Sequence, residues 1–123
     1  MVAIDAGDGV VHTHGGRRPT SVATRDWAVT AWQMGAGEIL LTSIRQDGQR
    51  TGFDLSLTAE IRAAVSIPVI ASGGAGSAAH VAAALRVADA ALVASIVHEN
   101  PSGLAGLRRD VEREGITLRP WKE

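Results

Sequence analysis

The chain has 123 residues, a formal net charge of −1 and no cysteine. The balanced charge reserves no face for nucleic acid or a membrane surface, and no apolar run approaches the ~20 residues of a membrane span. Without cysteine there is no disulfide framework and no thiolate chemistry. The N-terminus lacks the pattern of a signal peptide, so a cytoplasmic protein is expected.

Four short apolar runs, each bounded by glycine or polar residues, predict buried β-strands. The runs are Val2–Ile4, Glu38–Thr42, Pro68–Ala71 and Ala90–Ala94. The apolar residues are Val, Ile, Leu and Ala, with a single Phe. Such a composition suits a parallel sheet that is buried on both faces.

A helical stretch follows each run. The first is expected at Arg25–Met34, where Thr24 is a candidate N-cap and Gly35 a left-handed terminator. The others are expected at Leu55–Val65, Ser77–Val87 and Ser102–Glu114. The order βαβαβαβα predicts right-handed crossovers and a parallel sheet. Two α/β architectures fit this order: a (βα)4 half of a TIM (βα)8 barrel, and an open flavodoxin-like sheet.

The one long connection, residues 6–23, is expected to carry a β-hairpin at about residues 9–20. His12 and His14 alternate on its first strand and would share a face. Two imidazoles do not complete a metal site, so a solvated hairpin face is favoured and no metal is expected. Residues 1–123 are therefore expected to form one half-barrel domain with a hairpin insertion.

The strongest functional signal is a glycine-rich loop, residues 72–76, between a predicted strand and a predicted helix. Glycines let backbone N–H groups approach an anion, and a helix N-terminus adds partial positive charge. The following predicted strand, Ala90–Ala94, ends at the same edge of the sheet as this loop. Adjacent strand ends of this kind build the phosphate site of TIM barrels. The alternative is a tight turn with no ligand. The predicted phosphate-binding residues here are Ser72, Gly73, Gly74, Ala94 and Ser95.

Two carboxylates follow predicted strands. Asp47 lies in a polar loop that Gly48 makes pliable, and it would point over the barrel mouth, where acid–base groups act. The alternative for Asp47 is a surface Asp-Gly turn. Asp5 ends the first strand, where a buried carboxylate is costly unless a site uses it. Asp47 and Asp5 are the candidate catalytic residues.

Several segments together resemble the cyclase subunit of imidazole glycerol phosphate synthase, a (βα)8 barrel of histidine biosynthesis. The segments are Val2–Asp5, Thr13–Arg17 with Pro19-Thr20, Gly35–Ser43, Asp47-Gly48, Pro68–Gly76 and Ala88–His98. The resemblance runs from the fifth strand of that family to its C-terminus and covers essentially the whole chain. It therefore implies the C-terminal half of the barrel.

The resemblance implies a lyase that needs no cofactor and takes ammonia from a glutaminase partner. The implied reaction converts a phosphoribulosyl-formimino aminoimidazole carboxamide nucleotide into imidazole glycerol phosphate and the aminoimidazole carboxamide ribonucleotide. It also implies acid–base roles for Asp47 and Asp5, a phosphate contact at Gly48, and an ammonia-gate role for Glu38. The chain departs from the family at Arg45, usually Asp or Asn, and at Gln49, usually Thr.

A four-stranded half sheet would leave two parallel edges open and expose an apolar layer. A homodimer that completes an eight-stranded barrel is therefore expected, with Asp5 of one copy facing Asp47 of the other. Such a barrel would bind two phosphate or sulfate anions. The alternative is a non-catalytic phosphate-binding scaffold, truncated or engineered, and Met1 directly before Val2 fits a chain begun at the half-barrel boundary.

Overall fold

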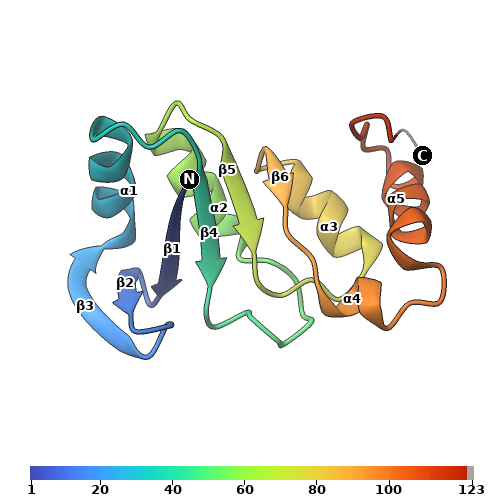
Figure 1. Ribbon diagram of the computed structural model, residues 1–123, viewed down its shortest axis with the longest axis horizontal. Helices are drawn as coiled ribbons and strands as arrows, with labels where there is room; N and C mark the ends of the chain where they lie inside the picture. The colour runs from blue at the N-terminus through green and yellow to red at the C-terminus, as the bar shows by residue number, and fades with distance from the viewer. Residues whose placement is uncertain (122–123) are drawn as a thin grey trace.

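A computed structural model describes residues 1–121, so Lys122 and Glu123 of the expected domain lie outside the described residues. Its strands join into one six-stranded sheet in the order β3-β2-β1-β4-β5-β6 (Figure 1). The strands are β1 Val2–Gly7, β2 Val10–Thr13, β3 Arg18–Ala23, β4 Ile39–Ser43, β5 Val69–Ser72 and β6 Ala90–Ala91. The helices are α1 Thr24–Gln33, α2 Leu55–Ala64, α3 Ala78–Leu85, α4 Ser95–His98 and α5 Gly103–Arg113.

Strands β1, β4, β5 and β6 are parallel and follow one another in chain order across the sheet. A flavodoxin-like sheet reverses its strand order at a switch point and covers both faces with helices. Here the order does not reverse, and each right-handed crossover places its helix on the same side. This arrangement is that of a half-barrel, as predicted, and not that of a flavodoxin-like sheet.

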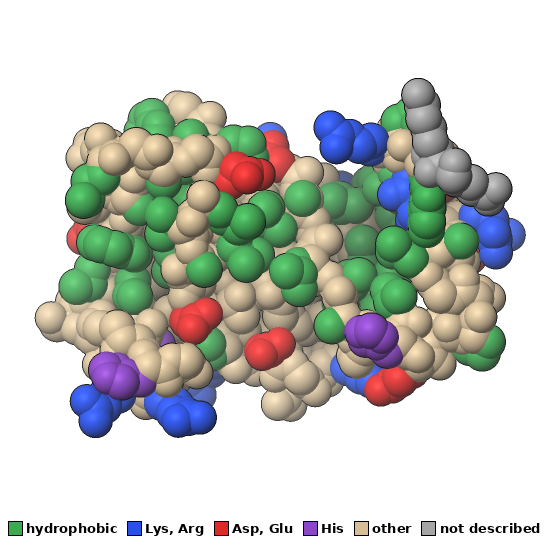
Figure 2. Space-filling view, viewed as in Figure 1, with side chains coloured by type: hydrophobic (Ala, Val, Ile, Leu, Met, Phe, Trp, Pro, Cys, Tyr) green, Lys and Arg blue, Asp and Glu red, His purple; other side chains and the backbone are tan. Residues whose placement is uncertain are grey.

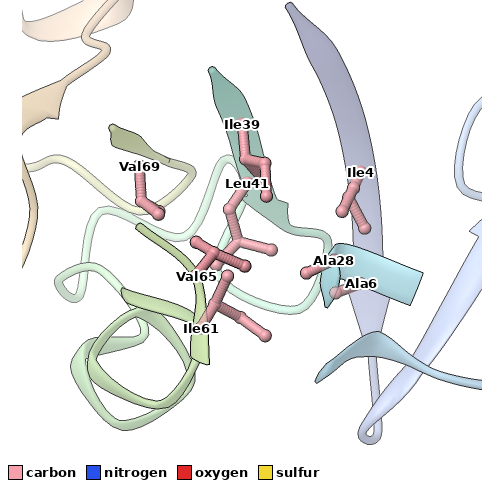
Figure 3. Packing of buried hydrophobic residues seen from close by; sticks show 8 residues of the cluster. All are labelled: Ile4, Ala6, Ala28, Ile39, Leu41, Ile61, Val65 and Val69. Atoms are coloured by element: carbon pink, nitrogen blue, oxygen red, sulfur yellow. The ribbon is translucent and has the colours of Figure 1, made fainter. Parts of the chain in front are cut away.

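The main core lies between the sheet and helices α1 and α2. Alternate strand residues point into it, because successive side chains of a strand face opposite sides. Figure 3 shows this cluster of Ile4, Ala6, Ala28, Ile39, Leu41, Ile61, Val65 and Val69. A second cluster, around Phe53, Leu107 and Val111, lies under α3 and α5. The two clusters together hold the helix layer on the sheet.

The opposite face of the sheet is uncovered. Ala3 is exposed, Leu40 and Ile70 are half-buried, and Leu92 is 44% exposed. Pairing aligns Ala3 with Leu40 and Leu40 with Ile70 across three strands. Figure 2 shows hydrophobic side chains gathered over the strands on this side. The single chain therefore exposes an apolar layer, as expected of a half sheet, because its crossovers supply helices to one face only.

The long connection forms a hairpin, and β2 pairs with β1 through Asp5↔His12, Ala6↔Val11 and Gly7↔Val10. The hairpin therefore covers part of one of the two parallel edges that were expected to be open. The hairpin satisfies the backbone groups of β1 from Asp5 to Gly7, which leaves only residues 2–4 of that edge unpaired. The unpaired part of β1 and the two-residue strand β6 are the open parallel edges.

Several element boundaries differ from those predicted. Strand β2 ends at Thr13, so His14 lies in the turn with φ +55° and does not share a strand face with His12. Ala23, not Thr24, is the N-cap of α1; Thr24 falls inside the first turn, where its buried Oγ1 has no partner among residues 1–121. β6 covers only Ala90–Ala91 of the predicted Ala90–Ala94, and the unpredicted α4 begins at Ser95.

Asp89 ties the beginning of β5 to α2. Its Oδ2 accepts hydrogen bonds from the Val69 N–H (3.0 Å) and from Arg62 Nε (3.2 Å), while its Oδ1 accepts from Arg62 Nη2 (3.1 Å). The Arg62 hydrogen bond, and then that of the Val69 N–H, hold the pKa of Asp89 below its ordinary value. A carboxyl whose pKa falls on folding stabilises the fold above its unfolded pKa, and this contribution disappears as pH falls through the folded pKa.

We predict that Asp89→Asn lowers the free energy of unfolding at pH 7 by roughly 1 kcal/mol or less, because the pair is partly exposed and screened. At pH 3 the difference between the two proteins should be smaller, because the contribution of the carboxylate is lost as the pH falls through its lowered pKa. Urea unfolding at both pH values measures it, with Glu60→Gln on α2 as the control. An equal difference at pH 7 and pH 3 contradicts the prediction.

Candidate functional site

The carboxyl ends of β4, β5 and β6 meet at one small pocket of about 70 Å³. Because a water molecule occupies about 30 Å³, this space fits a group of a few heavy atoms, such as a phosphate, and not a whole nucleotide. The lining contains all six residues predicted to grip phosphate, together with Asp47. The complete lining is Asp47, Gly48, Arg50, Ser72, Gly73, Gly74, Ala75, Leu92, Val93, Ala94 and Ser95.

The loop after β5 supplies free backbone donors to this pocket. Gly73 and Gly74 are buried with φ +94° and +105°, a left-handed conformation that favours glycine. Within residues 1–121, no acceptor takes the N–H groups of Gly73, Gly74 or Ala75. Buried amide groups are almost always paired in folded proteins. Unpaired N–H groups lining a pocket are what an anion would satisfy.

The loop after β4 packs tightly against the glycines. The Gly52 N–H donates to the Gly74 carbonyl (2.9 Å), and a Cβ on Gly74 would lie 2.1 Å from the Gly52 carbonyl oxygen. A Cβ on Gly73 would lie 2.7 Å from the Ser43 carbonyl oxygen. That same oxygen accepts the Asp47 N–H at 3.0 Å. Side chains at either glycine would therefore push the loop that carries Asp47 away from the pocket.

Arg50 is the one basic residue among those that line the pocket in the described part of the chain. Its backbone has φ +59°, a conformation uncommon outside glycine. Its guanidinium forms an ion pair with Glu99, the C-cap residue of α4. The hydrogen bond from Arg50 holds the pKa of Glu99 below its ordinary value. Sequence reasoning missed Arg50, because the path of the loop alone decides that a residue three positions beyond Asp47 turns back to the pocket.

The first residues of α3 are not among those that line the pocket; Gly76, Ser77 and Ala78 line a separate pocket of about 240 Å³. The helix begins at Ala78, and the Oγ of its N-cap residue Ser77 accepts the His80 N–H at 3.2 Å. The Gly76 N–H donates to Nδ1 of His80, also at 3.2 Å. The Ser77 contact satisfies one N–H group of the first turn, and the pocket is built from the loop before the helix.

Asp5 and Glu38 lie outside the pocket. Asp5 is half-buried and pairs in register with Thr42, which pairs with Ser72. At about 4.8 Å per strand, Asp5 is about 10 Å from the pocket residue Ser72, at the same end of the sheet. Glu38 is exposed at the opposite end, where its carbonyl accepts the Val2 N–H at 2.9 Å. A single chain therefore does not bring the two candidate acids into one pocket.

Arg45, which departs from the family pattern, points away from Asp47. It forms an ion pair with Asp8 in the turn between β1 and β2, and its hydrogen bond holds the pKa of Asp8 below the ordinary value. Both residues line a separate cavity of about 400 Å³. Gln49 is exposed in the same loop. Neither Arg45 nor Gln49 therefore lines the pocket.

Two negative findings apply to residues 1–121. No three His, Cys, Asp or Glu side chains gather there where they could hold a metal ion. No helix in that range is long and apolar enough to cross a membrane.

Comparison with known proteins agrees with this geometry. A family model described as "Histidine biosynthesis protein" matches residues 1–102. The chain is 49% identical to the imidazole glycerol phosphate synthase subunit HisF of Lysinibacillus sphaericus (strain C3-41), across 97% of this chain and 51% of that protein. It is 51% identical to the subunit HisF of Myxococcus xanthus (strain DK1622), across 89% of this chain and 44% of that protein.

The subunit HisF of Halalkalibacterium halodurans is 48% identical, across 97% of this chain and 50% of that protein. The chain thus spans about half the length of the curated relatives it matches. A half-barrel is what half of a (βα)8 protein should give. The chain therefore belongs to the histidine biosynthesis protein family, as a half-length relative of the imidazole glycerol phosphate synthase cyclase subunit.

Proposed function

We propose that this chain binds the phosphate of a phosphorylated nucleotide substrate and catalyses the cyclase reaction once a second (βα)4 unit completes its barrel. The observation that carries the proposal is the pocket itself. Three successive loops place unpaired backbone N–H groups, two small residues and one carboxylate around a space of phosphate size. TIM barrels bind substrate at this end of their strands.

In the proposed reaction the substrate is anchored through one phosphate, which holds its carbon chain over the sheet end. Ring closure with ammonia requires protons to move on and off the reacting atoms. Asp47, at the pocket rim and exposed, is placed to move them. Asp5 would supply the second acid from across the mouth. Both roles follow the resemblance to the cyclase family.

The second unit is proposed to be a second copy of this chain. The uncovered face carries Ala3, Leu40, Ile70 and Leu92, and water disfavours such a continuous apolar surface. The relatives are about twice as long, so a ring of their kind needs a second unit of this size. In a two-fold dimer, residues 2–4 of β1 would pair with β6 of the other copy. Asp5 of one copy would then face Asp47 of the other.

Ammonia supply is proposed to follow the family pattern. Glu38 lies at the end of the sheet opposite the pocket, which is where an ammonia gate and a docked glutaminase would be needed. Ammonium salts can replace a glutaminase in an assay. The catalytic proposal can therefore be tested without that partner.

We predict a concentration-dependent dimer in sedimentation equilibrium. Leu40→Arg, on the uncovered face, should leave a folded monomer, because it puts a charge where the second sheet would pack. Met34→Arg, at the 78% exposed end of α1, should remain dimeric. A wild-type protein that is monomeric at all concentrations, or dimers unaffected by Leu40→Arg, would contradict the second-copy proposal.

We predict that Gly74→Ala weakens the binding of inorganic phosphate by tenfold or more, because the new methyl group displaces the loop or fixes an unfavourable φ. Isothermal titration calorimetry measures the dissociation constant. Gly37→Ala is the matched control, since its Cβ would meet no atom within 4 Å. Equal phosphate affinity in wild type and Gly74→Ala would place the anion elsewhere.

We predict that the dimer converts the nucleotide substrate with ammonium salts at high pH and that Asp47→Asn lowers kcat at least 100-fold, as for loss of a general acid–base group. Glu112→Gln, on the exposed side of α5, should retain the wild-type rate. The alternative is a phosphate-binding scaffold without turnover. Phosphate binding with no turnover in wild type or variant would favour that scaffold.

A further inference from the structure

We propose that Arg50 is a phosphate-binding residue that exchanges partners, leaving Glu99 for the phosphate when phosphate binds. The inference rests on the proposed function, because it concerns the same pocket. It assigns the cation that the pocket needs and identifies Glu99 as the residue that competes for it.

The charge balance of the pocket requires a cation. A phosphate monoester carries nearly two negative charges at neutral pH, and the Asp47 carboxylate lines the same space. Backbone N–H groups contribute only partial charges. Arg50 is the one basic residue in the lining given by the described residues, and its guanidinium pairs with Glu99, which lines a neighbouring pocket together with Arg50. Its planar fork of N–H donors matches two phosphate oxygens at once.

The loop geometry keeps Arg50 beside the pocket. A Cβ on Gly76 would lie 2.2 Å from the Arg50 carbonyl oxygen, so the two loops are in backbone contact. One step further along, the Gly52 N–H donates to the Gly74 carbonyl. These two contacts, at Arg50 and at Gly52, fix the backbone on either side of Thr51. The Arg50 side chain can still change partners.

The Glu99 partner is weak enough to be replaced. The ion-paired side chains of Arg50 and Glu99 are 45% and 60% exposed, and pairs of that exposure contribute little free energy. A phosphate in the pocket offers Arg50 two charges and a bidentate contact. The exchange also breaks the link between the loop after β4 and the end of α4. Phosphate binding would thereby release the end of α4 from the loop after β4.

The test is a double-mutant cycle on the full 123-residue chain, with inorganic phosphate titrated by calorimetry. Arg50→Gln should raise the dissociation constant tenfold or more, as for loss of a charged hydrogen-bonding group. Arg50→Lys should give an intermediate value, because it keeps the charge and loses the fork. Arg25→Gln, on the exposed side of α1, removes the same charge far from the pocket and should bind like wild type.

Glu99→Gln is the decisive variant. It should lower the dissociation constant about two- to fivefold, because it removes the competitor for Arg50. In the Arg50→Gln background the same change should give no gain. If the pair only holds the pocket wall, Glu99→Gln will instead weaken binding, which overturns the exchange. An equal gain with and without Arg50 also overturns it, since long-range charge alone would then be the cause.

The outcomes separate this inference from the proposed function. If the wild type binds no phosphate, both fall. If Gly74→Ala abolishes phosphate binding while Arg50→Gln binds like wild type, the phosphate site stands and the role of Arg50 falls. Circular dichroism and thermal unfolding check that each variant folds. The Glu99→Gln single variant keeps Arg50, so its comparison with wild type does not depend on how well Arg50→Gln folds.

Discussion

One-sided coverage of the sheet is the constraint on which the rest of this structure depends. Each strand is joined to the next by a right-handed crossover, and with strands in chain order every helix falls on the same side. That side buries Ile4, Ile39 and Val69 completely or nearly so. The other side retains an aligned apolar row. One face of the sheet is thus well packed against helices, and the other face is bare. The proposal of a second unit rests on this topology.

The candidate site depends on close approach between two loops. Gly73 and Gly74 lack side chains where the loop after β4 passes within contact distance of their backbone. This contact brings Asp47, Gly48 and Arg50 to the donors of the loop after β5. All residues of the proposed anion site therefore lie within one chain. Asp5, the second proposed acid, lies two strands away on the same sheet face.

The hairpin links the fold to the barrel that the chain would form. By pairing with Asp5–Gly7, strand β2 protects the C-terminal half of the β1 edge from non-specific pairing. Only residues 2–4 remain for another strand, and the partner edge β6 is equally short. Arg45 and Asp8 fasten the loop after β4 to this hairpin. The departure at Arg45 thus has a structural role outside the pocket that carries Asp47.

The sequence by itself determined the parallel βα order, the four strands near their observed positions, the hairpin and six of the residues that line the pocket. It could do so because strand periodicity, glycine and residue type act locally, and because several short segments match one family. Only the tertiary structure decided that one face stays bare, that the hairpin covers part of β1, that α3 caps itself and that Arg50 reaches the pocket. Each of these depends on contacts between segments distant in sequence, which no local pattern records.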